Sequence, residues 1–404
     1  MQKRIMILGA GAAQLNLIKC AKEQNYFTIV CDMRPEMEGS QIADQYYQVN
    51  YMDQQAVLSV ANKERIDGVI SNSEPAMSSV SYLVDQMHLP GNSTQSLDNL
   101  LSKTKFRELQ KKVGVFSPES VTSGILEEIL EQAEQLRFPI MIKPAESSGS
   151  RGATEIMHYD PEQISAAFYL CQSFSRNNQV TAEEFVKMES LDVVNADVFV
   201  IGEEILWDGW YGGLRSARKP MIPMAKVLPP DLSQERMHRI KNDVNSLLRA
   251  SGVSLGEFNV ETYFSDRGEL FVIEINPRQA GNDIPKLILE HTGVDLTKLL
   301  VTLTVGDFTY YNHLKNYRRI NRLITLQVVF CEQDGVYRGL QIDERIRPFV
   351  RWIREFVKPG DRVYDARNAT DAVAYVDLEF DTTEQQNYFT RRIEEVIRAK
   401  VDQE

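Results

Sequence analysis

The residues best suited to chemistry lie past the middle of the chain, in a short apolar segment that carries two polar side chains. Residues 270–276 read Leu-Phe-Val-Ile-Glu-Ile-Asn, a pattern typical of a buried strand, with Glu274 and Asn276 two residues apart. Side chains at this spacing in a strand point to the same face. A carboxylate in such a strand is costly to bury unless it is paired or bound to a metal ion.

A second carboxylate is expected to face the first. Residues 257–264 and 269–276 flank a Ser-Asp-Arg-Gly turn and predict a β-hairpin that would bring Glu261 opposite Glu274. Two carboxylates and an amide oxygen form a hard-oxygen site suited to Mg²⁺ or Mn²⁺. Arg278 would place a fixed cation beside that site for an anion. The alternative is a half-exposed hairpin with an ordinary polar face.

A lysine followed by a loop rich in serine and glycine indicates a phosphate site. The strand predicted at residues 140–143 ends in Lys143, and the following loop contains Ser147-Ser148-Gly149-Ser150. Such loops offer N–H groups and hydroxyls to phosphate oxygens, and a nearby lysine adds positive charge. The lysine precedes the loop, so this is not the GxxxxGK[ST] P-loop. The alternative is a solvated lysine beside a flexible loop.

The N-terminal segment predicts a parallel sheet. Apolar segments within residues 4–71 alternate with helical patterns, which indicates parallel strands with helices on both faces. Gly9-Ala10-Gly11 and Asp32 are placed as in a dinucleotide-binding site, but Gln14 stands at the third glycine position. We interpret the motif as a tight strand–helix turn, with a nicotinamide site as the less favoured alternative.

The rest of the chain predicts a mixture of helices and strands without internal repeats. Helices are expected at residues 102–115, 124–136, 233–252 and 384–400, and strands at 180–186, 193–201, 323–330 and 372–380. Residues 209–230 contain several glycines and prolines and are expected to form an ordered loop region.

Composition excludes several classes of function. The chain has 404 residues, 43% of them hydrophobic, and its net charge of −12 argues against nucleic acid as the main partner. The four cysteines form no CxxC pair and the five histidines form no HExxH motif, which argues against zinc ribbons, redox pairs and zinc hydrolases. With no long apolar segment, we expect a cytoplasmic protein with no membrane partner.

Several of these features occur in a fixed order: Lys103, Lys143 with its Ser/Gly loop, Glu183-Glu184-Phe185-Val186, Glu261, and Glu274-Ile275-Asn276-Pro277-Arg278. This order and spacing resemble the ATP-grasp superfamily over about residues 1–310. The resemblance implies an α/β fold with a Rossmann-like parallel sheet at residues 1–91. It also implies a two-subdomain α+β ATP-grasp domain at 92–310, with a lid at about 116–187, and a small α+β part at 311–404.

The resemblance also implies roles for individual residues. ATP would be bound by Lys103, Lys143, Ser147, Ser148, Gly149, Ser150, Glu183, Glu184, Phe185, Val186 and, at the ribose, Asp192 or Glu189. Within this set, Glu183 and Val186 would contact adenine through the backbone. Two Mg²⁺ or Mn²⁺ ions would be bound by Glu261, Glu274 and Asn276. Lys143 and Arg278 would be the catalytic residues.

The activity implied is that of a ligase, in which ATP phosphorylates a carboxylate and an amine then attacks the acyl phosphate. The candidate substrate-binding residues are Glu74, Arg215, Lys226, Arg278 and Gly281. We favour an amino-acid or peptide-type ligase, possible as a homodimer. The alternatives are a phosphoribosylamine–glycine ligase, a biotin-carboxylase-like enzyme, and a nucleotide-binding regulator without turnover.

Overall fold

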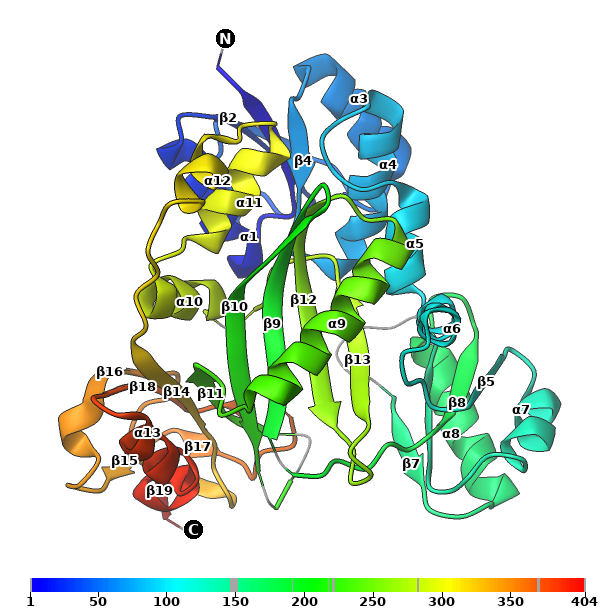
Figure 1. The fold of residues 1–404 in the computed structure, drawn as a ribbon, viewed down its shortest axis with the longest axis vertical. Helices are drawn as coiled ribbons and strands as arrows, with labels where there is room; N and C mark the ends of the chain where they lie inside the picture. The colour runs from blue at the N-terminus through cyan, green and yellow to red at the C-terminus, as the bar shows by residue number, and fades with distance from the viewer. Residues whose placement is uncertain are drawn as a thin grey trace.

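Four sheets organise the molecule, and the largest runs through its middle (Figure 1). The computed structural model describes residues 2–145, 152–190, 192–216, 218–219, 222–281, 283–368 and 371–402. Around the central sheet lie an N-terminal unit, a four-stranded unit at the edge formed by β13, and C-terminal elements at the opposite end (Figure 1).

The N-terminal unit is the expected parallel sheet, with strand order β3-β2-β1-β4. Its elements are β1 (Arg4–Leu8), α1 (Ala12–Glu23), β2 (Phe27–Asp32), α2 (Glu38–Ile42), β3 (Gln45–Gln48), α3 (Gln54–Glu64), β4 (Gly68–Ile70), η1 (Glu74–Ala76) and α4 (Met77–Met87). The side chain of Asp53 caps α3 by accepting a hydrogen bond from the Ala56 N–H.

The four-stranded unit, which we call the β5–β8 unit, is antiparallel with strand order β5-β8-β6-β7. It contains β5 (Ser120–Ser123), α7 (Leu126–Ala133), β6 (Ile140–Pro144), β7 (Thr154–Ile156), α8 (Pro161–Phe174) and β8 (Val180–Glu184). Its two helices pack on the sheet through a small core of its own that includes Ile129, Ile140 and Phe168.

The central sheet has the order β13-β12-β9-β10-β11-β14-β18-β16. Its strands are β9 (Asp192–Ile201), β10 (Glu204–Arg215), β11 (Pro223–Leu228), β12 (Leu255–Phe264), β13 (Leu270–Asn276), β14 (Leu323–Val329), β16 (Val350–Glu355) and β18 (Ala374–Phe380). One core packs this sheet against α5 (Thr94–Leu101), α6 (Lys103–Val113) and α9 (Gln234–Ser251). The opposite face packs against α10 (Ile284–Thr292) and α11 (Leu296–Thr304).

The C-terminal elements are continuous with the central sheet, because β14, β18 and β16 extend it beyond β11. The remaining elements are α12 (Thr309–Leu314), β15 (Gly335–Ile342), η2 (Arg347–Phe349), β17 (Arg362–Val363), α13 (Thr383–Thr390), α14 (Ile393–Val396) and β19 (Ile397–Asp402). The boundaries proposed at residues 91 and 310 stay predictions.

Two local expectations were wrong. The segment 384–400 is not one closing helix: it breaks after α13 and α14 and ends in β19, which pairs with β15. The segment 209–230 is not a loop region, because most of it forms β10 and β11. β19 pairs with β15 and β11 pairs with β14, and these partners lie far away in the sequence. Such partners override local preference. β10 instead pairs with β9 and β11, its neighbours in the sequence.

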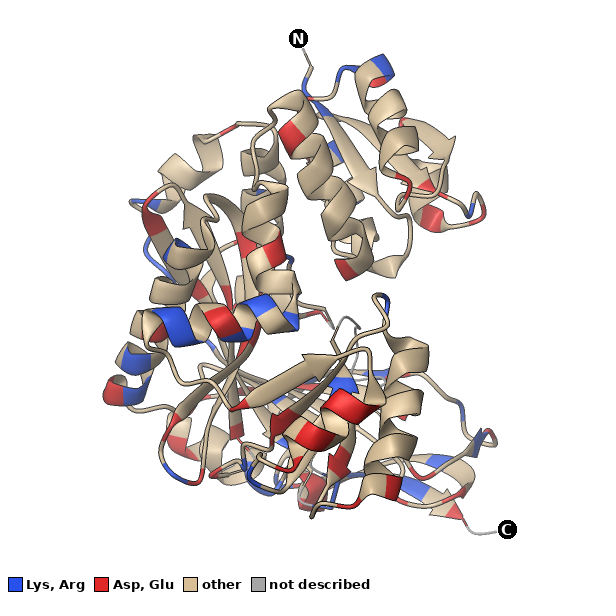
Figure 2. Ribbon diagram, turned by 90° about the vertical axis from the view of Figure 1, so that its right-hand side faces the viewer, with Lys and Arg blue, Asp and Glu red and all other residues tan. Residues whose placement is uncertain are grey.

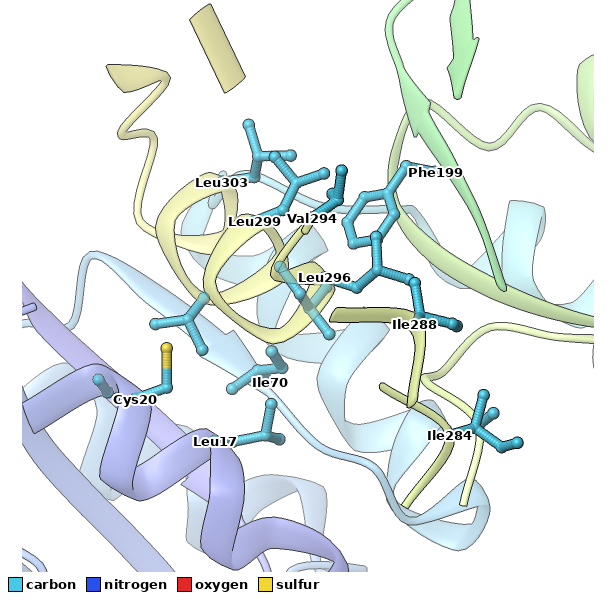
Figure 3. Close-up of a cluster of buried hydrophobic side chains, with 14 of the residues drawn as sticks. Leu17, Cys20, Ile70, Phe199, Ile284, Ile288, Val294, Leu296, Leu299 and Leu303 are labelled. Carbon is cyan, nitrogen blue, oxygen red and sulfur yellow. The ribbon is translucent and has the colours of Figure 1, made fainter. Parts of the chain in front are cut away.

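A shared hydrophobic core joins the N-terminal unit to the central sheet (Figure 3). Leu17 and Ile70 of the N-terminal unit pack with Leu299 of α11, and Phe199 of β9 belongs to the same cluster. These side chains are almost completely buried. Because apolar contacts of this kind resist separation, the N-terminal unit is held in place against the helices of the central sheet.

Basic and acidic residues are interspersed along the chain and do not separate into one basic and one acidic part (Figure 2). Among the described residues, no helix combines the length and apolar character needed to cross a bilayer.

We expect Leu299→Ala to destabilise the protein by about 2–5 kcal/mol, because the side chain is 1% exposed and its loss leaves a cavity between two units. Leu289→Ala is the matched control, since Leu289 is 39% exposed and should cost about 1 kcal/mol or less. Urea unfolding of both variants measures the difference. Equal losses would mean that the interface contributes little.

Candidate active site

The two carboxylates expected to face each other do so at the edge of the central sheet. Glu261 of β12 lies directly opposite Glu274 of β13, and the Asn276 Nδ2 donates to the Glu274 Oε1 at 2.7 Å. The pairing skips Ile273, so β13 is bulged there. Bulges re-aim side chains and are frequent beside active sites. The hairpin thus gathers two carboxylates and one amide, as predicted.

The electrostatic surroundings of Glu261 fit a cation-binding role. Burial raises the pKa of Glu261 and the charge of Glu274 raises it further, while Lys226, Arg215 and Arg278 act in the opposite direction. Two carboxylates this close repel each other unless a cation lies between them. No group of three His, Cys, Asp or Glu side chains suited to a metal occurs among the described residues, so the third oxygen ligand would come from Asn276. This donor set suits Mg²⁺ or Mn²⁺.

A cleft of about 880 Å³ opens beside these residues. It is lined by all five residues predicted to bind substrate and by Glu261; the five are Glu74, Arg215, Lys226, Arg278 and Gly281. They come from the N-terminal unit, β10, β11 and the turn after β13, so the fold brings together residues that lie far apart in the sequence. The volume leaves room for more than one small substrate.

Glu74, which comes from the N-terminal unit, lies near Glu274, one of the predicted metal ligands. Glu74 begins η1, which follows β4 after a link of three residues. Burial raises its pKa, and the Glu274 carboxylate raises it further, whereas the charges of Arg278 and Lys103 lower it. The charges of the other three side chains therefore all act on Glu74. An acid in this position can bind an ammonium group or accept a proton.

Other cleft residues were not found from the sequence. Tyr211 lies below Lys226, with the Lys226 Nζ 5.3 Å from the ring centroid. Arg354, Phe356 and Tyr375 reach the cleft from the C-terminal strands. The C-terminal part therefore forms one of its walls, and sequence spacing gave no signal for this arrangement.

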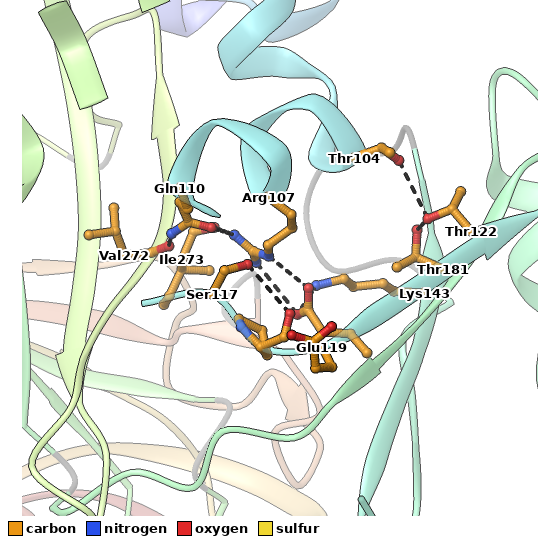
Figure 4. A network of polar contacts seen from close by, with 12 residues as sticks. Thr104, Arg107, Gln110, Ser117, Glu119, Thr122, Lys143, Thr181, Val272 and Ile273 are labelled. Atoms are coloured by element: carbon orange, nitrogen blue, oxygen red, sulfur yellow. Dashed lines mark hydrogen bonds and ion pairs between the residues drawn. The ribbon is translucent and has the colours of Figure 1, made fainter. Parts of the chain in front are cut away.

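A buried ion-pair network lies between α6, β6 and β8 (Figure 4). The Glu183 carboxylate accepts a hydrogen bond from the Lys143 Nζ at 2.5 Å and from the Arg107 Nε at 2.7 Å. Burial alone would raise the pKa of Glu183, but the two cations outweigh it and bring the pKa to about 2. Burial lowers the pKa of Lys143, and the Arg107 charge contributes in the same direction.

Arg107 was not identified from the sequence. Its Nη1 also donates to the Gln110 Oε1 at 2.8 Å and to the Ile273 carbonyl at 3.1 Å, while the Gln110 Nε2 donates to the Val272 carbonyl at 2.8 Å. One arginine therefore connects the bulged strand β13 to Glu183 of the β5–β8 unit. The one indication in the sequence was that Arg107 and Gln110 are three residues apart in a predicted helix, so their side chains lie on the same face.

The segment after β8 offers an apolar surface for a planar ring. The Val186 carbonyl accepts a hydrogen bond from the Tyr263 hydroxyl at 2.6 Å. Val186 and Tyr263 belong to a small buried cluster with Phe271, and Phe116 packs on it. The side chain of Glu184 turns away and pairs with Arg137 at 2.9 Å. Of the residues predicted to contact adenine, Phe185 and Val186 follow β8 directly. Glu183 lies within β8, and its carboxylate belongs to the buried ion-pair network.

The remaining predicted nucleotide residues are placed as follows. Lys103 is the first residue of α6, and its charge lowers the pKa of Lys143. Asp192 lies 3.9 Å from Arg391, measured from Oδ2 to Nη1, and Glu189 pairs with Arg236 at 2.6 Å. Ser147, Ser148, Gly149 and Ser150 lie outside the described residues.

The Gly9-Ala10-Gly11 turn has a structural role. The Asp32 carboxylate accepts hydrogen bonds from the Ala10 N–H at 2.8 Å and from the Arg34 Nε at 3.0 Å. Its oxygens are thus engaged by the protein, which agrees with the interpretation of a tight strand–helix turn.

Comparisons of sequence identify similar proteins. Residues 102–194 match the family described as carbamoyl-phosphate synthase L chain, ATP binding domain. The carbamoyl phosphate synthase large chain of Clostridium beijerinckii is 27% identical over 326 residues, which cover 75% of this chain and 29% of that protein. The chain therefore spans less than a third of the length of this relative.

Two solved structures share the fold over the whole length. L-amino acid ligase from Bacillus licheniformis superposes with a TM-score of 0.78 at 15% identity, covering 99% of both chains. Phosphoribosylglycinamide synthetase from Anaerococcus prevotii superposes with a TM-score of 0.74 at 19% identity, covering 100% of both chains. At such low identity these similarities establish the fold, and the α/β fold class is confirmed.

We expect Glu183→Gln to destabilise the protein by about 3–5 kcal/mol, because it leaves two buried cations without their carboxylate. Glu184→Gln is the matched control, since the neighbouring Glu184 pairs with a largely exposed arginine and should cost about 1 kcal/mol or less. Urea unfolding at neutral pH checks both values. A Glu183→Gln variant as stable as the control would contradict the network's importance.

The same network predicts a pH dependence. The pKa of Glu183 falls from an ordinary 4.5 to about 2 on folding, so its stabilisation is complete above about pH 4.5 and is lost as the pH falls toward 2. The stability gap between wild type and Glu183→Gln should therefore narrow over that interval. Urea unfolding at a series of acidic pH values measures it, and a constant gap would contradict the assignment.

Proposed function

We propose that this chain, an ATP-grasp protein by its fold, is an ATP-dependent ligase that activates a small carboxylate as an acyl phosphate and joins it to an amine. The observation that carries the proposal is one shared cleft: Glu261 and Glu74 lie there with four cationic residues, Arg215, Lys226, Arg278 and Arg354. An anionic substrate, a divalent cation and an amine would each find a complementary group within it.

The nucleotide would lie between the β5–β8 unit and the central sheet. Adenine would rest on the apolar cluster beside Val186, and within the described ranges the Val186 N–H donates to no protein group, which leaves it available for a ring nitrogen. Lys103 and Lys143 would meet the phosphates. The Glu183 carboxylate aligns the Lys143 ammonium and keeps it inside the fold.

Glu261, Glu274 and Asn276 would hold Mg²⁺ or Mn²⁺, which neutralises phosphate charge and orients the transferred group when bound. Arg278 contributes a fixed positive charge on the cleft side of the same site. Charge neutralisation and positioning supply most of the catalysis in phosphoryl transfer, and the chain has residues for both.

The two steps balance without a protein nucleophile. A substrate carboxylate oxygen attacks the γ-phosphorus and ADP leaves, and the amine nitrogen then attacks the acyl carbon and releases phosphate. Arg215 and Lys226 would bind the carboxylate, while Glu74 would bind the ammonium and take its proton before attack. The presence of both carboxylate-binding and ammonium-binding groups favours an amino-acid or peptide-type ligase.

An assay of ADP release with ATP, Mg²⁺, hydroxylamine and a panel of carboxylic acids tests the proposed reaction. We expect ADP and a hydroxamate to form together, because hydroxylamine traps an acyl phosphate. Bicarbonate-dependent ADP would indicate a carboxylase, and ATP binding without ADP would indicate a regulator. Release of AMP in place of ADP would contradict the mechanism.

We expect Glu274→Gln to lower the rate of ADP formation about 100-fold or more, because metal-held charge stabilisation is worth several kcal/mol and about 1.4 kcal/mol is tenfold in rate. Glu269→Gln is the matched control, since Glu269 lies at the far end of the same hairpin and accepts a bond from the Ser265 hydroxyl. Circular dichroism confirms folding of both. Near-normal turnover of Glu274→Gln would remove this residue from the site.

A further inference from the structure

Two carboxyl groups are buried side by side beneath the floor of the cleft. Asp197 of β9 is 0% exposed and Glu257 of β12 is 2% exposed. Asp197 pairs in register with Asn259, and Glu257 lies two residues before Asn259, so both carboxyl groups are on the same face of the sheet. Neither residue was singled out from the sequence, and the proposed reaction uses neither.

The hydrogen bonds around the pair are unequal. Asp197 accepts from the Asn259 Nδ2 at 2.9 Å and from the Ala280 N–H at 3.2 Å. Glu257 accepts from the Gln279 Nε2 at 2.9 Å through one oxygen. Its other oxygen, Oε1, is buried and has no partner among the described residues. Leaving a buried polar atom unpaired costs about 1–3 kcal/mol, so the arrangement calls for an explanation.

One proton, held by one of the two carboxyl groups, accounts for these unequal hydrogen bonds. Two adjacent buried carboxylates cannot both ionise, and the donors converge on Asp197, which identifies it as the anion. Burial raises the pKa of Glu257 well above its ordinary value, and the Asp197 and Asp295 charges raise it further. The pKa of Asp197 is raised less, because hydrogen bonds and the Arg278 charge favour its anion. A protonated Glu257 can donate to Asp197.

The pair holds the turn that follows β13. Gln279 donates to Glu257 and the Ala280 N–H donates to Asp197, while the Arg278 carbonyl accepts from the Asn259 N–H at 3.1 Å. Arg278, Gln279 and Ala280 are therefore each held by a hydrogen bond to β9 or β12, and all three line the cleft. The Gln279 Oε1 also accepts from the Thr297 hydroxyl at 3.2 Å, which links the turn to α11.

We propose that Glu257 is a neutral carboxylic acid that shares its proton with Asp197, and that this pair positions Arg278 and its turn against the substrate. Both are positioning residues, since they act through the turn. The protonation claim is independent of the proposed ligase activity, whereas its consequence for catalysis rests on that activity.

Infrared difference spectroscopy of wild type against Glu257→Gln tests the protonation. At neutral pH we expect the carbonyl band of a protonated carboxylic acid in the wild type, lost in the variant. This measurement needs no turnover, so it stands even if the chain shows no ligase activity. Absence of the band would overturn the proposal, because Glu257 would then be ionised.

Kinetics of paired variants test the positioning. Glu257→Ala should lower kcat/KM for the acid about tenfold or more, because small misplacements of a positioned group are costly, while the KM for ATP stays within about twofold. Glu257→Gln should recover most of the loss, since its amide can donate to Asp197 and accept from Gln279. Circular dichroism checks folding.

Two kinetic results would overturn the positioning role. If Glu257→Gln is as impaired as Glu257→Ala, the site requires an ionised carboxylate at this position, and a neutral hydrogen-bonding group is not sufficient. An unimpaired Glu257→Ala would show that the turn needs no support from below. If the wild type releases no ADP with any acid, the proposed function fails, and the infrared band alone decides the protonation.

Discussion

The arrangement of the cleft depends on one constraint: the charges of Glu261 and Glu274, which face each other across β12 and β13, repel and must be compensated. Such a pair is unfavourable in a partly buried place unless positive charge compensates it. The chain supplies that charge from three directions, through Lys226, Arg215 and Arg278. None of these lies on the carboxylate-bearing strands, so the compensation exists only in the folded molecule. The cleft is the space between these groups.

A second ionic group connects the parts that surround the cleft. Glu183 receives both Lys143 of its own unit and Arg107 of α6, and Arg107 also reaches the bulged strand β13. Movement of the β5–β8 unit relative to the central sheet would therefore strain a buried, charge-assisted contact. Such contacts are strong and directional. The position of Lys143 is tied in this way to that of strand β13, which carries Glu274 and Asn276.

Local patterns in the sequence predicted the parallel N-terminal sheet and the Glu261–Glu274 hairpin, and both are present in the structure. The predicted α/β fold class was also confirmed. A hairpin fixes its own register, so Glu261 and Glu274 could be paired from sequence alone.

The contacts between remote segments could not be predicted in this way. Glu183 and Arg107 are separated by 76 residues, and no local pattern links them. Gly209 suggested a loop, yet a Cβ there would lie 2.2 Å from the Asp197 carbonyl, so the glycine permits close strand packing. The strand β19 was mistaken for helix because its partner β15 is remote in sequence.

The bulged strand β13 is also the outermost strand of the central sheet. An outermost strand exposes backbone groups that can recruit a strand from another molecule, which is a route to aggregation. Here the side chains of Arg107 and Gln110 occupy the Ile273 and Val272 carbonyls. Two side chains of α6 therefore occupy two backbone carbonyls of the outermost strand, and one of them, Arg107, also belongs to the buried ion-pair network.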